Sequence, residues 1–214
     1  MRLNLGCGAT PTDGWVNLDN SIAVRLARWP FVIRALSMAR ITDSRSYQFA
    51  RIASAKGIKF ANASLHIPCA NGSVEAVYSS HMIEHLDRRE AKDFLGEVRR
   101  ILVPGGVVRI AAPDLGLLVR NYQTLGDADE FISRTHMCQE RPHGVAPRFR
   151  MAFLGSRHHL WMYDGRSLVK LLSEAGFADV QVMPEGKTLI PDPAGLDLTE
   201  RAAESVYVEA VQPR

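Results

Sequence analysis

The chain has 214 residues, of which 46% are hydrophobic and 23% are charged, and its formal net charge is +3. This composition is typical of a folded domain, and it excludes a disordered chain or a disulfide-rich secreted module. The net charge is too small to indicate a nucleic-acid partner. The sequence shows no paired cysteine spacing, no long apolar span and no secretory leader, so we expect a cytoplasmic protein.

Short apolar runs alternate with longer helical patterns along the chain, which is typical of an α/β fold with a mostly parallel sheet. The runs predict strands at residues 3–5, 16–19, 58–62, 74–80, 107–112, 179–183 and 205–211. Apolar residues at three- and four-residue steps predict helices at 88–102, 115–125 and 166–175. Asp87 and Glu90 have capping-box spacing, and Pro104 with the following glycines is expected to stop the first of these helices.

Residues 21–56 form a basic and apolar insertion within what we expect to be a single domain, 1–214. Its basic residues are Arg25, Arg28, Arg34, Arg40, Arg45, Arg51 and Lys56. Pro30 excludes one continuous helix, so we expect one or two surface helices that cover the sheet. Peripheral contact with a membrane surface is the alternative, because basic residues alternate here with large apolar ones.

The first predicted strand ends in a glycine-rich turn, LNLGCG at residues 3–8. In an open parallel sheet such a turn lets the backbone approach a ligand at the carboxyl ends of the strands. Asp19 ends the second predicted strand, where a carboxylate can accept hydrogen bonds from a ribose. Pro11 stands where a dinucleotide fingerprint would continue with glycine, and Asp19 follows closely, so the turn disfavours NAD or FAD.

Further motifs follow in a consistent order: IPCANGSVEAVYSSHMIEHL, EVRRILVPGGVVRIAAPDL, HHLWMYDGRSLVKLLSEAGFADV and SVYVEA. Together with the opening turn they resemble the class I S-adenosylmethionine-dependent methyltransferases, particularly the small bacterial methyltransferase domain 11 type. The resemblance covers nearly the whole chain apart from residues 21–56. It implies a doubly wound, mostly parallel seven-stranded sheet of Rossmann-like type with the last strand antiparallel, and S-adenosyl-L-methionine as the cofactor.

The resemblance also implies a set of cofactor contacts. It puts the glycine turn against the methionine part of the cofactor, Asp19 on the ribose, and Asn62 where many relatives have an aspartate beside the adenine. Ser80 ends a strand and could touch the methionine end. The expected cofactor-binding residues are Gly6, Cys7, Gly8, Asp19, Asn62, Ala63 and Ser80.

Three residues are candidates for catalysis. His81 follows strand 74–80 beside the expected cofactor site, and its imidazole suits the removal of a proton from a hydroxyl acceptor. Asp114, after the next strand, could position the acceptor. His159 is a second candidate for substrate contact, since the resembled proteins often have a histidine there. A strand-end cap for His81 and a hydrogen-bonded loop position for His159 are the alternatives.

The run HMIEH, residues 81–85, also matches the H-x-x-E-H pattern of a zinc peptidase helix. The run begins at a strand end rather than on a helix, so we disfavour that function. Some of the resembled methyltransferases hold a divalent metal with a similar run, which makes His81, Glu84 and His85 a weaker alternative metal site. We expect no metal, with Glu84 and His85 fixing local structure.

The sequence therefore predicts an S-adenosylmethionine-dependent O-methyltransferase that acts on a small-molecule or glycan hydroxyl, the glycan being implied by the resemblance alone. A nucleic-acid methyltransferase is the competing substrate class, although we expect no nucleic-acid partner. A non-catalytic protein that binds S-adenosylmethionine is favoured only by Asn62. A nicotinamide oxidoreductase is the remaining alternative.

Overall fold

The computed structural model describes residues 1–38, 44–138 and 158–214, and it contains one sheet in the order β3-β2-β1-β4-β5-β7-β6. The strands are β1 (Arg2–Leu5), β2 (Val16–Asp19), β3 (Lys59–Phe60), β4 (Val74–Ser80), β5 (Leu102–Pro113), β6 (Ala178–Met183) and β7 (Ser205–Val211). The strands β1 to β5 pair in parallel, while β7 is antiparallel to both β5 and β6. The expected doubly wound α/β class, with its last strand antiparallel, is confirmed.

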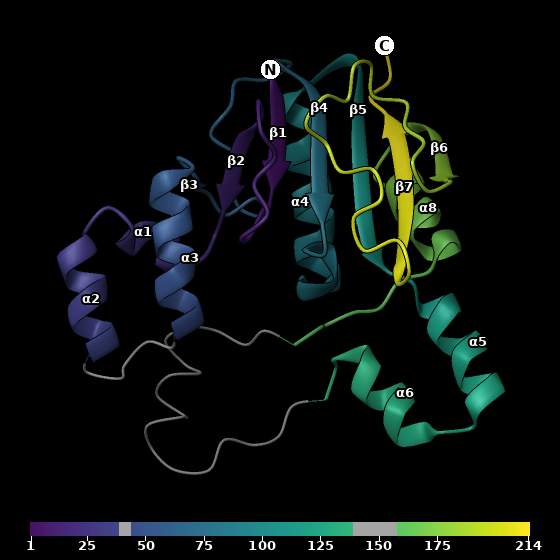
Figure 1. The fold of residues 1–214 in the computed structure, drawn as a ribbon. Coiled ribbons are helices and arrows are strands. Elements are labelled where there is room, and N and C mark those ends of the chain that lie inside the picture. Colours follow the sequence, from purple (N-terminus) through teal and green to yellow (C-terminus); the bar gives the residue numbers. More distant parts are fainter. Residues whose placement is uncertain (39–43, 139–157) are drawn as a thin grey trace.

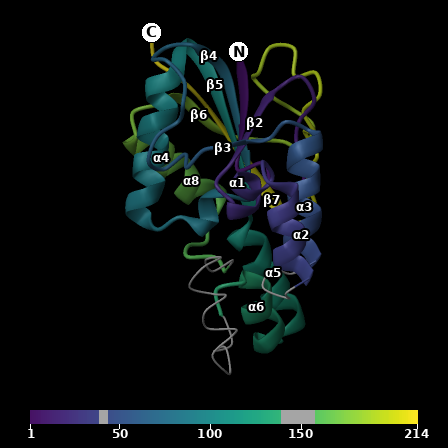
Figure 2. The same cartoon turned by 90° about the vertical axis from the view of Figure 1, so that its left-hand side faces the viewer.

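The direction of the strands decides where a site can lie. In Figure 1 the arrowheads of β2 and β4 point down and that of β7 points up, so the carboxyl ends of the parallel strands meet at the lower edge. The helices α5 (Leu115–Leu125) and α6 (Ala128–Thr135) lie beyond that edge in both views (Figures 1 and 2). The turn after β1 and the residues after β2 and β4 therefore share one end of the sheet.

One face of the sheet is covered by α4 (Arg88–Ile101) and α8 (Gly165–Glu174), which lie on the same side in Figure 2. The apolar side of α4 is fully buried; it consists of Ala91, Phe94, Leu95, Val98 and Ile101. Each large apolar side chain buried in this way stabilises the fold by roughly 1.5–3 kcal/mol. The predicted capping box of Asp87 and Glu90 is present, and Asp164 caps α8.

The opposite face carries a buried ion pair. Arg109 of β5 and Glu209 of β7 stand directly opposite each other, are fully buried, and approach to 2.7 Å. Arg109 also donates to the carbonyl oxygens of Lys187 and Leu198, at 2.9 and 3.1 Å. Since these carbonyls belong to the connection between β6 and β7, the pair fastens that connection to the sheet.

The described residues of 21–56, which are 21–38 and 44–56, form three helices rather than the expected one or two: α1 (Ile22–Leu26), α2 (Pro30–Met38) and α3 (Ser44–Ala55). Val24 and Ala53 pack with Cys7 of the first turn, so α1 and α3 lie against that turn. Within the described residues, no helix is long and apolar enough to cross a bilayer. The single-domain organisation and the membrane contact stay predictions.

Two strands have an end that differs from the sequence prediction by more than one residue. The fifth strand was expected at 107–112, but β5 begins at Leu102, directly after α4. The Pro104–Gly106 segment does not end the pairing: it forms an irregularity between the pairs Val74–Leu102 and Ala76–Val107. The strand expected at 58–62 is only Lys59–Phe60.

Candidate active site

The first turn depends on glycine in two different ways. Gly6 has φ +69°, and a Cβ there would lie 2.8 Å from the Met82 Cβ, so neither the backbone nor the space admits a side chain. Gly8 also has a positive φ, +50°, but no described atom lies within 4 Å of the position its Cβ would take. The turn is thus closed toward Met82 and open beside Gly8, which leaves room for a ligand against the backbone.

Asp19 lies at the end of β2 and faces this turn. One carboxylate oxygen accepts the Gly8 N–H at 3.0 Å, and the other accepts the Ser21 N–H at 2.8 Å. The side chain is buried. The structure therefore brings the predicted Gly6, Gly8 and Asp19 together beside the open space, which fits a ribose at this position.

Cys7 lies between the two glycines and points into the packing of α1 and α3. Burial, together with the charge of Asp19, raises the pKa of its thiol to about 12. The thiol is therefore neutral at pH 7 and packs as an apolar side chain. The cofactor contact of Cys7 stays a prediction, and it would be made by the backbone.

The predicted adenine segment follows β3. The side-chain oxygen of Asn62 accepts the N–H and the hydroxyl of Ser64, at 3.2 and 2.8 Å, which leaves the amide nitrogen to donate to a ligand. Glu97 and Arg100 of α4 hold the chain beyond Ala63: Glu97 accepts the Ile67 N–H at 2.8 Å. The roles expected for Asn62 and Ala63 stay predictions.

His81 follows β4 at the carboxyl edge, next to Ser80, and its backbone is in the left-handed region, with φ +48°. Its Nε2 lies 2.8 Å from the Ser205 hydroxyl, and its Nδ1 lies 3.5 Å from Glu84 Oε1. A residue other than glycine held at positive φ is a strained position of the kind that collects at functional sites. Ser205 was not predicted, because only the sheet order brings the start of β7 to this edge.

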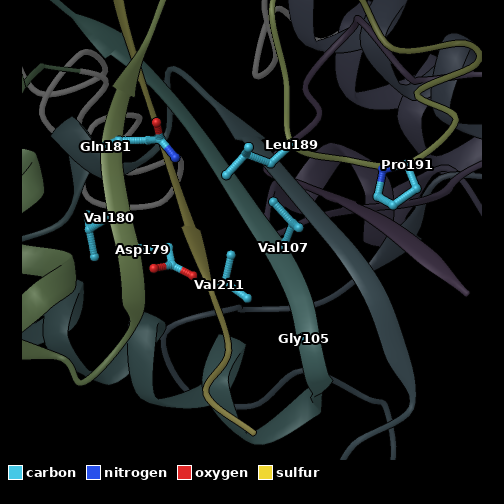
Figure 3. Close-up of a pocket in the computed structure, with 8 residues that line it drawn as sticks. All are labelled: Gly105, Val107, Asp179, Val180, Gln181, Leu189, Pro191 and Val211. Carbon is cyan, nitrogen blue, oxygen red and sulfur yellow. The ribbon is translucent and has the colours of Figure 1, made fainter.

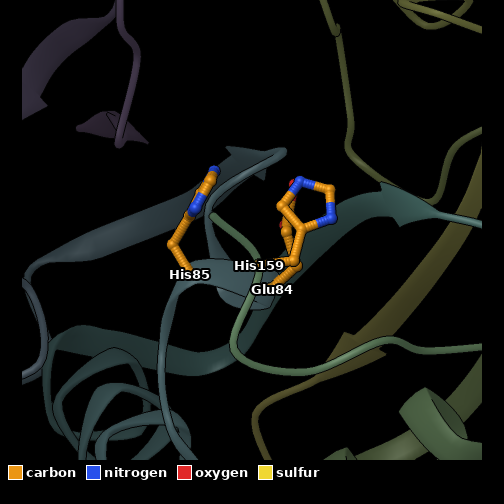
Figure 4. A group of neighbouring side chains, drawn as sticks. All are labelled: Glu84, His85 and His159. Atoms are coloured by element: carbon orange, nitrogen blue, oxygen red, sulfur yellow. The ribbon is translucent and has the colours of Figure 1, made fainter. Parts of the chain in front are cut away.

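Glu84 and His85 lie in a single turn of 3-10 helix, η1 (Ile83–His85), directly after His81. The structure brings His159, from the segment before α8, against them (Figure 4). The rings of His85 and His159 meet edge to face with 5.0 Å between centroids, and His159 Nε2 lies 3.9 Å from Glu84 Oε1. Burial lowers the pKa of His159 to about 4, so its ring is neutral at pH 7.

Asp114 ends β5 at the same edge and serves as the N-cap of α5. One oxygen accepts the Gly116 N–H at 2.9 Å, and the other lies 3.5 Å from an Arg120 nitrogen. Its side chain is partly exposed and still reaches solvent at this edge. Helix capping is a structural role that explains the position of the Asp114 carboxylate. The role of Asp114 in positioning the acceptor stays a prediction.

A separate hollow of about 490 Å³ lies where β5 begins and β7 ends (Figure 3). It is lined by Gly105, Val107, Asp179, Val180, Gln181, Leu189, Pro191 and Val211. Because Val107 and Val211 lie at the start of β5 and the end of β7, this hollow is at the opposite end of the sheet from His81. None of the predicted site residues lines it.

Comparison with known proteins agrees with this arrangement. Residues 32–110 match the family model described as a methyltransferase domain. An S-adenosylmethionine-dependent methyltransferase of Methanosarcina mazei has a similar structure, with a TM-score of 0.54 and 16% sequence identity. The similarity covers 99% of this chain and 92% of that chain. A second S-adenosylmethionine-dependent methyltransferase, from Thermotoga maritima and described as a possible histamine N-methyltransferase, has a TM-score of 0.53 and 15% sequence identity. The similarity covers 99% of this chain and 81% of that chain. No curated protein matches.

The strand order with an antiparallel β7, and the similar structures, define the fold as that of the class I methyltransferases. The matched segment runs from α2 through most of β5 and includes Asn62, His81 and Glu84. Residues 32–110 match the methyltransferase-domain model, and the described fold is similar to that of S-adenosylmethionine-dependent methyltransferases.

Proposed function

We propose that the chain is an S-adenosylmethionine-dependent methyltransferase that transfers the methyl group to a hydroxyl oxygen of a small molecule or glycan. The observation that carries the proposal is the position of His81 between Ser205 and the buried carboxylate of Glu84. A carboxylate beside Nδ1 favours the tautomer with its proton on Nδ1, which leaves the lone pair on Nε2. That nitrogen, 2.8 Å from the Ser205 hydroxyl, already accommodates an O–H group.

In this proposal S-adenosylmethionine would supply the methyl group from its sulfonium, and S-adenosylhomocysteine would leave as the acceptor oxygen attacks the methyl carbon in line. His81 Nε2 takes the hydroxyl proton as the oxygen attacks, and Glu84 stabilises the ring that becomes charged. The carbon–sulfur bond breaks with its electron pair on sulfur, and the proton passes from His81 to solvent. The residues of the first turn and Asp19 hold the nucleoside and the methionine tail, so their main contribution is orientation.

Three arginines outside residues 21–56 are bound within the fold. Arg109 is buried against Glu209, Arg100 is bonded to Glu97 at 2.8 Å, and Arg99 donates to the Ala175 carbonyl at 2.9 Å. These arginines stabilise the fold itself and are not available to phosphates. The preference for a glycan rests on the resemblance described for the sequence.

The test is a screen for S-adenosylhomocysteine release with sugars, phenols, amines and RNA as acceptors. We expect turnover with a hydroxyl acceptor, and we expect His81→Gln to lower kcat by about 10²–10⁴, the usual contribution of a general base. Calorimetry with S-adenosylhomocysteine should give the same affinity for His81→Gln and for the parent chain.

The control variant is His66→Ala, which removes an exposed histidine outside the site and should keep full turnover. Transfer to amines or RNA alone, or unchanged kcat in His81→Gln, would contradict the proposal.

A further inference from the structure

The carboxylate of Glu84 has an unusual environment. Its side chain is 1% exposed, and neither oxygen accepts a hydrogen bond from any residue in the described parts of the chain. A buried carboxylate without hydrogen bonds is costly, because it has lost its hydration and received nothing in return. The groups around it are imidazole rings: His81 Nδ1 at 3.5 Å and His159 Nε2 at 3.9 Å.

The hydrogen bonds of the two neighbouring rings fix where their lone pairs are. His85 Nδ1 lies 3.1 Å from the carbonyl oxygen of His158, which only accepts, so Nδ1 carries the proton. His159 Nδ1 lies 3.4 Å from the Met162 sulfur, a thioether with no hydrogen to donate, which favours the tautomer with its proton on Nδ1. With the proton on Nδ1, the neutral form of each ring has its lone pair on Nε2.

Donor atoms of Glu84, His85 and His159 all lie within 4.8 Å of one another. Two lone pairs and a carboxylate that meet in a buried place leave a position for a cation. We propose that these three residues bind one divalent first-row transition-metal ion. The sequence analysis gave His81, Glu84 and His85 as an alternative metal site. In the site proposed here His159 takes the place of His81, and the proposal replaces the expectation of no metal.

The chemistry of the donors selects the ion. Two imidazoles and one carboxylate suit Zn²⁺, Fe²⁺ or Co²⁺, whereas Mg²⁺ and Ca²⁺ prefer oxygen ligands alone. Three protein ligands leave a coordination position open, as in catalytic rather than structural sites. The carbonyl of His158 lies 3.1 Å from His85 Nδ1, and this hydrogen bond would orient the ring so that Nε2 could bind the metal.

The position of the site suggests its use. Met82, directly before η1, packs against Gly6 of the cofactor turn, and His81 Nδ1 approaches the same Glu84 oxygen, Oε1, as His159 Nε2 does. An ion there would lower the pKa of an acceptor hydroxyl and help His81 to remove its proton. This use rests on the proposed O-methylation, but metal binding itself does not.

Titration of the chelator-stripped full chain with Co²⁺ tests the site, because Co²⁺ bound by imidazole shows d–d bands that Zn²⁺ abolishes when it displaces the ion. We expect one Co²⁺ per chain, displacement by Zn²⁺, and no displacement by Mg²⁺. Glu84→Gln and His159→Ala should each weaken Co²⁺ binding by at least about tenfold, since each removes one of three ligands. His66→Ala, which removes an exposed histidine, should leave the affinity unchanged.

Because Glu84 is buried, circular dichroism must show that its variant is folded, and Zn²⁺-edge anomalous diffraction from crystals of the parent chain gives an independent position. No Co²⁺ binding, an anomalous peak elsewhere, or equal loss in His66→Ala would overturn the metal site. S-adenosylhomocysteine binding measured on the same samples separates the two proposals. Cofactor binding and hydroxyl methylation without metal binding would overturn only the metal site, and metal binding without hydroxyl methylation would overturn only the proposed function.

Discussion

Met82 fills the space beside Gly6 that any side chain at position 6 would need. The two residues belong to different parts of the sheet, Gly6 to the turn after β1 and Met82 to the segment after β4. A Cβ built on Gly6 would lie 2.8 Å from Met82 Cβ, well inside van der Waals contact. The cofactor turn and the segment that carries His81 and Glu84 are therefore packed as one unit.

This contact predicts a contrast between two glycines of one turn. Gly6→Ala should lower the free energy of unfolding by roughly 2–4 kcal/mol, because it adds both backbone strain and overlap with Met82. Gly8→Ala should cost only about 1 kcal/mol, since its Cβ meets open space. Urea unfolding measures both, and the double variant Gly6→Ala/Met82→Gly should be more stable than the sum of the single losses predicts. Equal losses at the two glycines would contradict the packing described here.

A second prediction concerns the ribose site. Asp19→Ala should weaken S-adenosylmethionine binding by roughly 1.5–3 kcal/mol, because it removes a charged acceptor and releases the Gly8 and Ser21 N–H groups. Isothermal titration calorimetry measures the affinity. The matched control is Asp13→Ala, an exposed carboxylate paired with Lys56 before β2, which should bind the cofactor as the parent does. Unchanged affinity in Asp19→Ala would remove this residue from the site.

The third prediction is a pH dependence of stability. The Arg100 guanidinium, at 2.8 Å, holds the pKa of Glu97 at about 2 against an ordinary value of 4.5. Since the folded pKa lies below the unfolded one, the stabilisation is complete above the unfolded value and disappears as pH falls toward the folded value. Glu97→Gln should therefore cost about 2 kcal/mol near pH 7, reduced from the full shift by partial solvent access.

Urea unfolding of the parent and of Glu97→Gln should give curves that converge between pH 4.5 and about 2. Glu130→Gln provides the control, because Glu130 forms an exposed pair with Arg134 at 2.6 Å. That variant should change stability by less than about 1 kcal/mol at either pH. A difference between parent and Glu97→Gln that persists at the lowest pH would contradict the assignment.

The fourth prediction tests the membrane contact expected of residues 21–56. On and just before α2, Trp29, Phe31 and Met38 are exposed, Phe31 by 86% and Met38 by 77%. Anionic vesicles should sediment the parent chain, and Phe31→Ser/Met38→Ser should lose most of that binding. Leu125→Ser, which removes an exposed apolar side chain from the end of α5, should bind as the parent does. Absence of binding by the parent chain would reject the membrane contact.

Local patterns were sufficient for most of the secondary structure. The strands 16–19, 74–80 and 205–211 and the helix 115–125 were predicted with the bounds observed for β2, β4, β7 and α5. The capping box at Asp87 was predicted because both of its partners lie within one helical turn of each other. The start of β5 was wrong, since Pro104 and two glycines suggest a break and only pairing with β4 shows that the strand passes through them.

The site was predictable only in part, because some of its contacts join segments that are distant in the sequence. Gly6 and His81 follow predicted strands and Asp19 ends one, so parallel pairing alone brings them to one edge. His159 joins Glu84 and His85 through main-chain bonds from Leu160 and Trp161 to the Glu84 carbonyl, at 2.8 and 3.1 Å. No local pattern indicates these contacts. The helix α6 was not predicted either, and the carbonyl of its C-cap residue His136 accepts the His159 N–H.

The place of β7 in the sheet sets an order on folding. β7 is the last strand along the chain, yet it lies between β5 and β6, and β6 pairs with it in the described sheet. During synthesis β6 and α8 must therefore wait for the final strand before they can complete the sheet. Until then β5 presents an unpaired edge, which is open to pairing with other chains. Substitutions that slow the insertion of β7 should therefore reduce the yield of folded protein through aggregation, even where the finished fold tolerates them.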